Sequence, residues 1–301
     1  MGELDGRVAI VTGAGRGIGA AVAEGLAAEG ARVLVNDLGV ELDGSAGDAG
    51  PAREVADRIT AAGGIAIADS TDVTDFAATE RMVGRAVDEF GRLDVLVNVA
   101  GILRDGMIFK MSEEQWDAVI DVHLKGTFNT TRHAAAHWRA NRGGEFRLIN
   151  FTSASGLYGA PSQPNYAAAK MGIVGLTLSC ANALKQYGVT SNAISPVATT
   201  RMTMQVDKGR AIGQYAPENE KLSARNVVPP VVYLAGERSA WLNRRIISAG
   251  NGRIGLMTEF DVQREIVAVS GVWDVASAFA EIENAFKASI QYPNIFDRPR
   301  G

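Results

Sequence analysis

The 301-residue sequence contains a single cysteine, Cys180, and only three histidines. One thiol cannot form an internal disulfide, so a reducing compartment is expected and we predict a cytoplasmic protein. Cys180 lies in an apolar helical pattern without a nearby histidine, which favours buried packing over nucleophilic chemistry. His133 and His137 are spaced to share a metal on one helix face, but no third ligand follows at a suitable spacing. We therefore predict a helix surface there and no metal site.

The sequence also lacks long apolar runs and a strong excess of charge of either sign. It has no uninterrupted apolar stretch of about 18 residues, so no membrane span is predicted. The first residues run directly into a strand pattern, which leaves no room for a signal peptide. A net charge of −4 gives no general attraction to nucleic acid or to anionic membranes.

What the sequence does contain is a regular alternation of apolar, β-branched runs with helical patterns, which predicts an α/β fold. Residues 1–255 are expected to form one dinucleotide-binding and catalytic domain. A polar, weakly periodic stretch around residues 201–224 would be its substrate lid. Residues 256–301 are too few for a core of their own. They show helical spacing and are expected to pack on the same domain or on a neighbouring subunit.

The first predicted strand leads straight into a glycine-rich turn that opens a helix. The turn contains Gly13, Arg16, Gly17, Ile18 and Gly19. Glycines at such a turn let the backbone approach a pyrophosphate and leave the first helical N–H groups free to bind it. The turn therefore predicts a dinucleotide site, although the motif alone is only moderately specific. Gly15 is an extra glycine, and its expected role is turn flexibility.

An acidic residue, Asp37, ends the second predicted strand. A carboxylate here accepts hydrogen bonds from the adenosine ribose hydroxyls and repels a 2′-phosphate, which favours NAD over NADP. Arg16 argues the other way, because a cation in the turn could meet that phosphate. Asp37 has the greater weight because it lies opposite the ribose. Asp72 and Val73 are placed to hold the adenine edge, with a plain structural turn as an equal alternative.

The clearest chemistry follows the strand predicted at residues 148–151. Ser153 lies just past its carboxyl end, where ligands bind in open α/β sheets. Tyr166 and Lys170 share one face of the next helix. A tyrosine has a pKa of about 10, and an ammonium group one turn away favours the phenolate and lowers that pKa. The three residues suit proton exchange at a carbinol while a hydride leaves or arrives. Alone, the Tyr-Lys spacing would indicate only a solvated helix face.

Four motifs occur in order, namely residues 12–19, residues 98–101, Ser153, and Tyr166 with Lys170. Together they resemble the short-chain dehydrogenase/reductase family. The resemblance implies a Rossmann-type doubly wound parallel sheet of about seven strands, with helices on both faces and a C-terminal helical extension. It also implies a homodimer or homotetramer that joins through helices.

The resemblance adds cofactor contacts along the chain. Beyond the glycine turn it implies contacts from Asn98, Ala100, Gly101, Tyr166, Lys170, Pro196 and a threonine. Ala100 and Gly101 are small enough to let the nicotinamide ribose approach. Val197 stands where the family has a glycine after Pro196, and Thr200, rather than Thr199, is our choice for the nicotinamide carboxamide.

A narrower resemblance links the chain to the dehydrogenase module of peroxisomal multifunctional enzyme type 2, also called 17β-hydroxysteroid dehydrogenase type 4. It rests on residues 36–39, 101–105, 122–126, 153–159 and 201–203. It implies oxidation of (3R)-hydroxyacyl-CoA with NAD, with hydroxysteroids or steroid side-chain CoA thioesters as alternatives. Val99 replaces one structural asparagine of the family. His123 replaces the asparagine that completes a catalytic tetrad, so its part in a water relay, through backbone or ring, stays open.

Two other functions are weighed. An NADPH-dependent 3-oxoacyl thioester reductase would have a basic residue at the position of Asp37. A non-catalytic dinucleotide sensor would often lack the tyrosine or the lysine, and both are present. Arg104, Lys125 and Arg201 are candidate contacts for CoA phosphates, although each is better explained as a surface cation.

Overall fold

The computed structural model describes residues 2–39, 50–197, 223–269 and 271–289. The chain divides into two compact units, Met1–Met257 and Thr258–Gly301. Thr199, Thr200 and Arg201, and nearly all of the predicted lid, lie outside the described residues.

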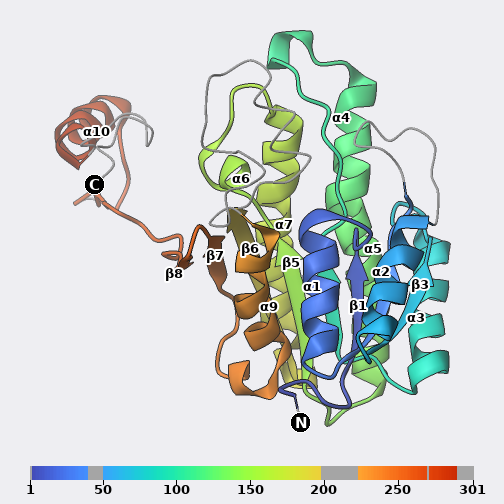
Figure 1. The fold of residues 1–301 in the computed structure, drawn as a ribbon. Coiled ribbons are helices and arrows are strands. Elements are labelled where there is room, and N and C mark those ends of the chain that lie inside the picture. The colour runs from blue at the N-terminus through green and yellow to red at the C-terminus, as the bar shows by residue number, and fades with distance from the viewer. Residues whose placement is uncertain (1, 40–49, 198–222, 270, 290–301) are drawn as a thin grey trace. The chain divides into compact units, whose positions relative to one another are not determined.

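Within the described residues, eight strands form one sheet in the order β3-β2-β1-β4-β5-β6-β7-β8 (Figure 1). The strands are β1 (Val8–Thr12), β2 (Arg32–Asn36), β3 (Ile65–Asp69), β4 (Val95–Asn98), β5 (Phe146–Phe151), β6 (Val189–Val197), β7 (Ile246–Gly250) and β8 (Arg253–Leu256). Strands β1 to β7 are parallel, and the order changes direction beside β1, as in a doubly wound fold. This confirms the predicted fold class.

The eighth strand is an addition that the sequence prediction missed. Strand β8 pairs antiparallel with β7 through a two-residue loop, Asn251 and Gly252, both with positive φ (54° and 69°). Asn-Gly is the strongest short-range signal for such a hairpin, because both central residues of its turn need positive φ. The dipeptide was therefore a sufficient clue to the extra strand.

Helices cover both faces of the sheet (Figure 1). One layer contains α1 (Gly17–Ala28), α2 (Gly50–Ala61) and α9 (Val228–Ala235), and the other contains α3 (Phe76–Phe90), α5 (Gly126–Ala140) and α7 (Pro164–Leu184). Each layer packs on the strands through its own buried apolar cluster, with Leu26 and Val231 in one and Met82 and Trp138 in the other. Both faces are buried, which explains why β1 and β4 are apolar except for their last residues, Thr12 and Asn98.

The helical segment from Glu113 to Ala140 is interrupted. A capping box opens it, because the Ser112 hydroxyl accepts the Gln115 N–H and the Gln115 side chain accepts the Ser112 N–H. The chain then forms α4 (Glu113–Ile120), a π-helical turn η2 (Asp121–Lys125), and α5. A π turn inserts an extra residue into the helix and often marks a functional site. Here it contains His123.

Helix α7 is the one described helix that is long and apolar enough to cross a membrane by length and composition. The sequence analysis predicts no membrane span because polar residues interrupt the apolar ones in the segment Pro164–Tyr187, which begins with α7. In the structure α7 packs on β6 and contributes two side chains to a pocket.

The other side-chain predictions for the helices have mixed outcomes. Cys180 packs on an apolar cluster, as expected. The prediction that His133 lies on a helix surface is wrong. The residue is buried, with its ring 4.3 Å from that of Phe76. This contact between two helices is tertiary packing, which a helical pattern alone does not indicate. Among the described residues no cluster of three metal-ligating side chains occurs.

The second unit contains α10 (Val275–Ser289), a helix that the spacing of Val275, Phe279, Ile282 and Phe286 predicted. Val275 and Phe279 on this helix are exposed. Where the unit packs remains a prediction.

Candidate active site

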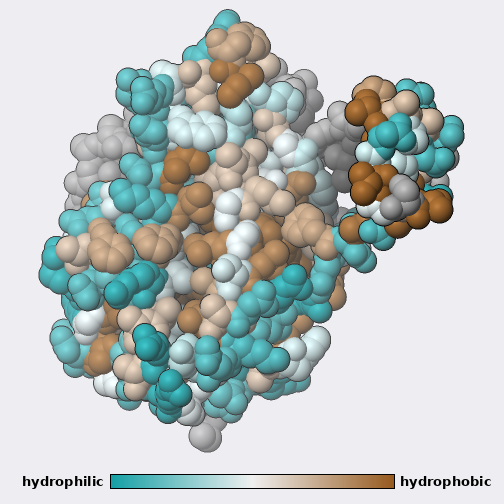
Figure 2. Space-filling model, turned by 180° about the vertical axis from the view of Figure 1, so that it is seen from behind, coloured by the Kyte–Doolittle hydropathy of each residue, from teal (hydrophilic) through white to brown (hydrophobic). Residues whose placement is uncertain are grey.

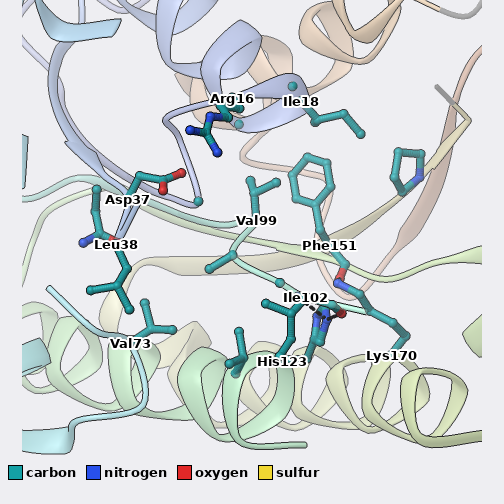
Figure 3. A pocket seen from close by; sticks show the side chains of 18 of the residues that line it. Arg16, Ile18, Asp37, Leu38, Val73, Val99, Ile102, His123, Phe151 and Lys170 are labelled. Carbon is teal, nitrogen blue, oxygen red and sulfur yellow. Dashed lines mark hydrogen bonds between the residues drawn. The ribbon is translucent and has the colours of Figure 1, made fainter. Parts of the chain in front are cut away.

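A pocket lies at the carboxyl ends of the central strands, and most of the predicted site residues line it (Figure 3). The predicted residues in its wall are Gly13, Arg16, Gly17, Ile18, Gly19, Asp37, Asp72, Val73, Ala100, Gly101, His123, Tyr166, Lys170 and Pro196. Arg16 and Asp37 lie at one end, the cofactor end, whereas His123 and Lys170 lie at the other, the catalytic end (Figure 3).

The glycine turn is built for close backbone approach. Gly13 and Gly17 have φ of 63° and 56°, the left-handed region that favours glycine. A Cβ atom on Gly13 would lie 2.6 Å from the Ala100 Cα, and one on Gly19 would lie 2.1 Å from the Gly13 carbonyl oxygen. The first helical turn of α1 has no side-chain cap and no acidic residue. Its N–H groups are therefore suited to an anion, and the cradle fits the pyrophosphate of a dinucleotide.

Gly15 has a different role from the flexibility predicted for it. Its N–H donates to Asp37 Oδ2 over 2.8 Å, and a Cβ atom on Gly15 would lie 2.8 Å from the same oxygen. The second oxygen, Oδ1, accepts the Gly39 N–H over 2.7 Å. Because Gly15 has no side chain, the Asp37 carboxylate has room beside it. Two backbone hydrogen bonds then fix the orientation of the carboxylate at the cofactor end.

Asp72 forms the predicted structural turn, and its contact with the adenine edge stays a prediction. Its carboxylate accepts the Thr74 N–H over 2.8 Å, which is a local turn, and the residue also lines the pocket. Asn98, by contrast, is outside the pocket wall. Its amide bonds to Asn150 and its oxygen accepts the Thr130 hydroxyl, so it joins β4 to β5 and α5.

At the catalytic end, Tyr166 and Lys170 lie one turn apart on α7, as predicted. The Lys170 ammonium is 5.6 Å from the centre of the Tyr166 ring and donates to the Phe151 carbonyl over 2.7 Å. Ser153 is partly buried and accepts the Ser155 N–H through Oγ over 3.2 Å. It approaches the phenol from the end of β5, although it is not in the pocket wall.

The predicted effect of Lys170 on the phenol is wrong for this protein without its cofactor. Burial, which penalises phenolate, raises the pKa of Tyr166 to about 12, despite the opposing hydrogen bond from Ser153. Burial also lowers the pKa of Lys170 to about 7, so the neighbouring amine is only partly charged at neutral pH. Desolvation outweighs the charge effect that the Tyr-Lys spacing suggested.

His123 is buried in the π turn, with its ring edge-on to Tyr166 and the ring centres 5.0 Å apart. Its Nε2 is 2.8 Å from the Ile102 carbonyl oxygen and 3.1 Å from the Ile102 backbone nitrogen, so it donates to the first in one neutral tautomer and accepts from the second in the other. Nδ1 then has no hydrogen-bond partner among the described residues. Burial, together with the nearby Lys170 charge, lowers the pKa of His123 to about 3. The ring is therefore neutral at neutral pH, and its part in a water relay stays a prediction.

Gly101 gives this histidine its space. A Cβ atom on Gly101 would lie 2.1 Å from His123 Cε1. Gly101, predicted to let a ribose approach, therefore also leaves room for the His123 ring. The missing side chain at residue 101 and the histidine at residue 123 thus depend on each other.

Several lining residues were not predicted. They are Asn36, Leu38, Thr71, Val99, Ile102, Val122, Phe151 and Thr152. Most are apolar or strand-end residues whose patterns indicate only a core, so no sequence signal marks them as site residues. Of the candidate phosphate contacts, Lys125 forms an ion pair with Asp121 at 3.5 Å, as a surface cation would.

Comparisons with known proteins agree with this geometry. A sequence model of the short chain dehydrogenase family matches residues 7–211. The hydroxyacyl-CoA dehydrogenase ChsB1 of Mycobacterium tuberculosis is 42% identical over 94% of this chain and 90% of its own length. Mouse peroxisomal multifunctional enzyme type 2 is 41% identical over 84% of this chain, which corresponds to 33% of that longer protein. The crystal structure of a short chain dehydrogenase from Mycobacterium avium superposes with a TM-score of 0.84 at 42% identity, over 99% of this chain and 100% of that one.

Proposed function

Because the chain belongs to the short-chain dehydrogenase family, we propose that it oxidises (3R)-hydroxyacyl-CoA to 3-oxoacyl-CoA with NAD. It is an oxidoreductase that acts on CH–OH groups with a nicotinamide cofactor. The observation that carries the proposal is the meeting of Tyr166, Lys170 and Ser153 at one end of a pocket whose other end is a glycine-built dinucleotide cradle.

Each side chain of the catalytic end has a part in the proposed reaction. The hydroxyl proton of the substrate passes to the phenolate oxygen of Tyr166 while the carbinol carbon gives up a hydride, which leaves a ketone. Ser153 Oγ accepts the Ser155 N–H, so its own O–H is available to donate to the substrate oxygen. Bound nicotinamide supplies the hydride acceptor and, in its oxidised form, a positive charge.

The protonation state of Tyr166 decides whether the site favours reduction of the ketone or oxidation of the alcohol. With a pKa of about 12, Tyr166 is a phenol at neutral pH and suits proton donation during reduction. Oxidation needs the phenolate, so positive charge near the phenol must lower its pKa. Lys170, with a pKa of about 7, supplies only part of that charge. The oxidative reaction therefore depends on the charge of the bound cofactor as well.

NAD is the proposed cofactor because of Asp37. Its carboxylate is held by Gly15 and Gly39 at the cofactor end, where it can accept ribose hydroxyls and repel a 2′-phosphate. Arg16 lines the same end, which is the argument for NADP. The carboxylate outweighs it because two backbone bonds fix its position.

The substrate class is supported by the names of two similar proteins, a hydroxyacyl-CoA dehydrogenase and a peroxisomal multifunctional enzyme. The test is the rate of cofactor reduction across (3R)- and (3S)-hydroxyacyl-CoA of several chain lengths, free 3-hydroxy acids, hydroxysteroids and a steroid side-chain CoA thioester, each with NAD and NADP. We expect the highest kcat/KM with NAD and a (3R)-hydroxyacyl-CoA. No turnover of any CoA thioester would refute the proposed substrate class.

The same panel tests the main alternative. A 3-oxoacyl-[acyl-carrier-protein] reductase of Synechocystis is 39% identical over 80% of this chain, so a reductase acting on a carrier-bound thioester is a reasonable second candidate. It would prefer NADPH and the reductive direction. Asp37 disfavours it.

We also infer a homodimer or homotetramer. Helix α7 is apolar, yet only 33% of its most apolar window is buried, and Met171 on it is exposed. Figure 2 shows apolar and neutral residues gathered over the middle of the face that α3, α5 and α7 cover. A second copy seated there would bury this surface. Sedimentation velocity of the whole chain checks this, and a monomer at micromolar concentration would contradict it.

A further inference from the structure

A chain of three polar side chains lies beside Ser153 and outside the pocket wall. The Ser155 hydroxyl donates to Gln163 Oε1 over 3.0 Å. The Gln163 amide donates to both oxygens of Asp105, over 3.1 Å and 3.2 Å. Gln163 is buried, whereas Asp105, in the loop after β4, is exposed on its outer side. The loop after β4 and the segment from Ser155 to Gln163, which are far apart in the sequence, thus meet through one amide.

The chemistry of the three groups fixes the direction of every bond. An ionised carboxylate can only accept, so Gln163 must turn its NH₂ group toward Asp105. Its oxygen then faces Ser155, whose hydroxyl must donate. Ser155 in turn donates its backbone N–H to Ser153 Oγ over 3.2 Å. Ser153 Oγ therefore accepts at this bond, which leaves its one O–H able to turn from the phenol to the substrate oxygen.

The loop that carries Asp105 is held against the start of α7. The Gly106 N–H donates to the Ser162 carbonyl over 2.8 Å. The Asn165 amide donates to the Arg104 carbonyl over 2.9 Å, and its oxygen accepts the Tyr166 N–H over 2.8 Å. Asp105 is thus fixed relative to both Ser155 and the catalytic tyrosine.

We propose that Asp105 and Gln163 are positioning residues, which orient Ser155 so that the Ser153 hydroxyl is presented to the substrate oxygen. This rests on the proposed roles of Ser153 and Tyr166. The charged or titratable groups that face the phenol are Asp105 from the loop after β4, Lys170 from α7 and His123 from the π turn. The His123 ring is neutral, so Asp105 is the negative charge and Lys170 the positive one. The repulsion from Asp105 is among the causes that raise the Tyr166 pKa.

The experiment compares Asp105→Asn, Ser155→Ala and Asp117→Asn in the full chain. Asparagine keeps an oxygen for the Gln163 amide but removes the charge, whereas alanine removes the Ser155 hydroxyl but keeps the charge. Asp117 is an exposed carboxylate on α4 and serves as the matched charge control. The first readout needs no substrate: it is the tyrosinate absorbance of each variant against pH, minus that of the same variant carrying Tyr166→Phe. The second is kcat on the alcohol that the wild type turns over best.

Asp105→Asn should move the Tyr166 titration to lower pH by roughly half a pH unit, less than the 1–3 units of a charge in direct contact. Ser155→Ala should leave that titration in place and lower kcat about two- to tenfold, the range for one lost hydrogen bond. If Asp105→Asn titrates like Asp117→Asn, or if Ser155→Ala lowers only the melting temperature, the inference is overturned. A wild type that turns over no CoA thioester refutes the proposed substrate instead, since the titration is read without one.

Discussion

At the cofactor end of the pocket the surface that meets a ligand is backbone, whereas at the catalytic end it consists of polar side chains packed among apolar ones. Gly13, Gly15 and Gly19 matter because they have no Cβ atom, and the residue type alone determines that absence. Tyr166 and Lys170 act through protonation states that depend on how much of the surrounding chain excludes water. The close approach at Gly13 and Gly19 could therefore be predicted from the residue type, whereas the place that Gly15 gives Asp37 and the pKa of a buried group could not.

The largest effect we expect is from Tyr166→Phe, which breaks the catalytic end alone. Removing the phenolic oxygen should lower kcat about 100- to 10,000-fold, the usual contribution of general acid–base catalysis. The dissociation constant for NADH, measured by fluorescence titration, should change little because the cradle at Gly13 is untouched. Near-normal turnover would show that another group accepts the proton.

Gly101→Ala tests the one place where the two ends touch. The new methyl group would lie 2.1 Å from His123 Cε1, so the ring must shift. We expect kcat/KM to fall roughly 5- to 100-fold, in line with overpacking of a tight site. Gly84→Ala is the matched control: it lies within α3 with no atom inside 4 Å of the added carbon, and it should stabilise the helix. Equal activity of both variants would mean that the ring moves freely.

Asp37→Ala breaks the cofactor end while leaving the catalytic end intact. It should raise the ratio of kcat/KM for NADP over NAD on the order of 10-fold, because the repulsion of a 2′-phosphate is lost. Asp37→Asn keeps an acceptor for one of the two backbone bonds from Gly15 and Gly39, and so separates loss of charge from loss of loop structure. An unchanged ratio in both variants would assign cofactor choice to another residue.

The smallest effect concerns His123. Because burial holds its pKa at about 3, the ring is neutral at every pH above about 4. His123→Asn should therefore lower kcat modestly, by about two- to tenfold through lost packing against Tyr166, without changing the shape of the pH profile. The measurement is kcat against pH for both proteins. If the wild-type profile showed a change of slope near neutral pH that the variant lacked, the ring would be shown to titrate.

The same contrast explains which predictions succeeded. The alternation of strands and helices, the glycine turn, and the pairing of Tyr166 with Lys170 on one helix face follow from local pattern, and the structure has all of them. The π turn that buries His123, and the packing that buries His133, depend on contacts between elements far apart in sequence. The Asp105–Gln163–Ser155 chain joins the loop after β4 to residues 155–163, two segments that no spacing rule connects. The hairpin at Asn251 is the exception, because its signal was local.

The most direct test of this account is the titration of Tyr166 itself in the protein without cofactor. The tyrosinate absorbance of the wild type minus that of Tyr166→Phe isolates this one phenol. The structure predicts a pKa of about 12, raised by burial, so the difference signal should stay absent until well above pH 10. A phenol that titrates below about pH 10 would contradict the account and restore the simpler view, in which the neighbouring lysine alone makes Tyr166 a base.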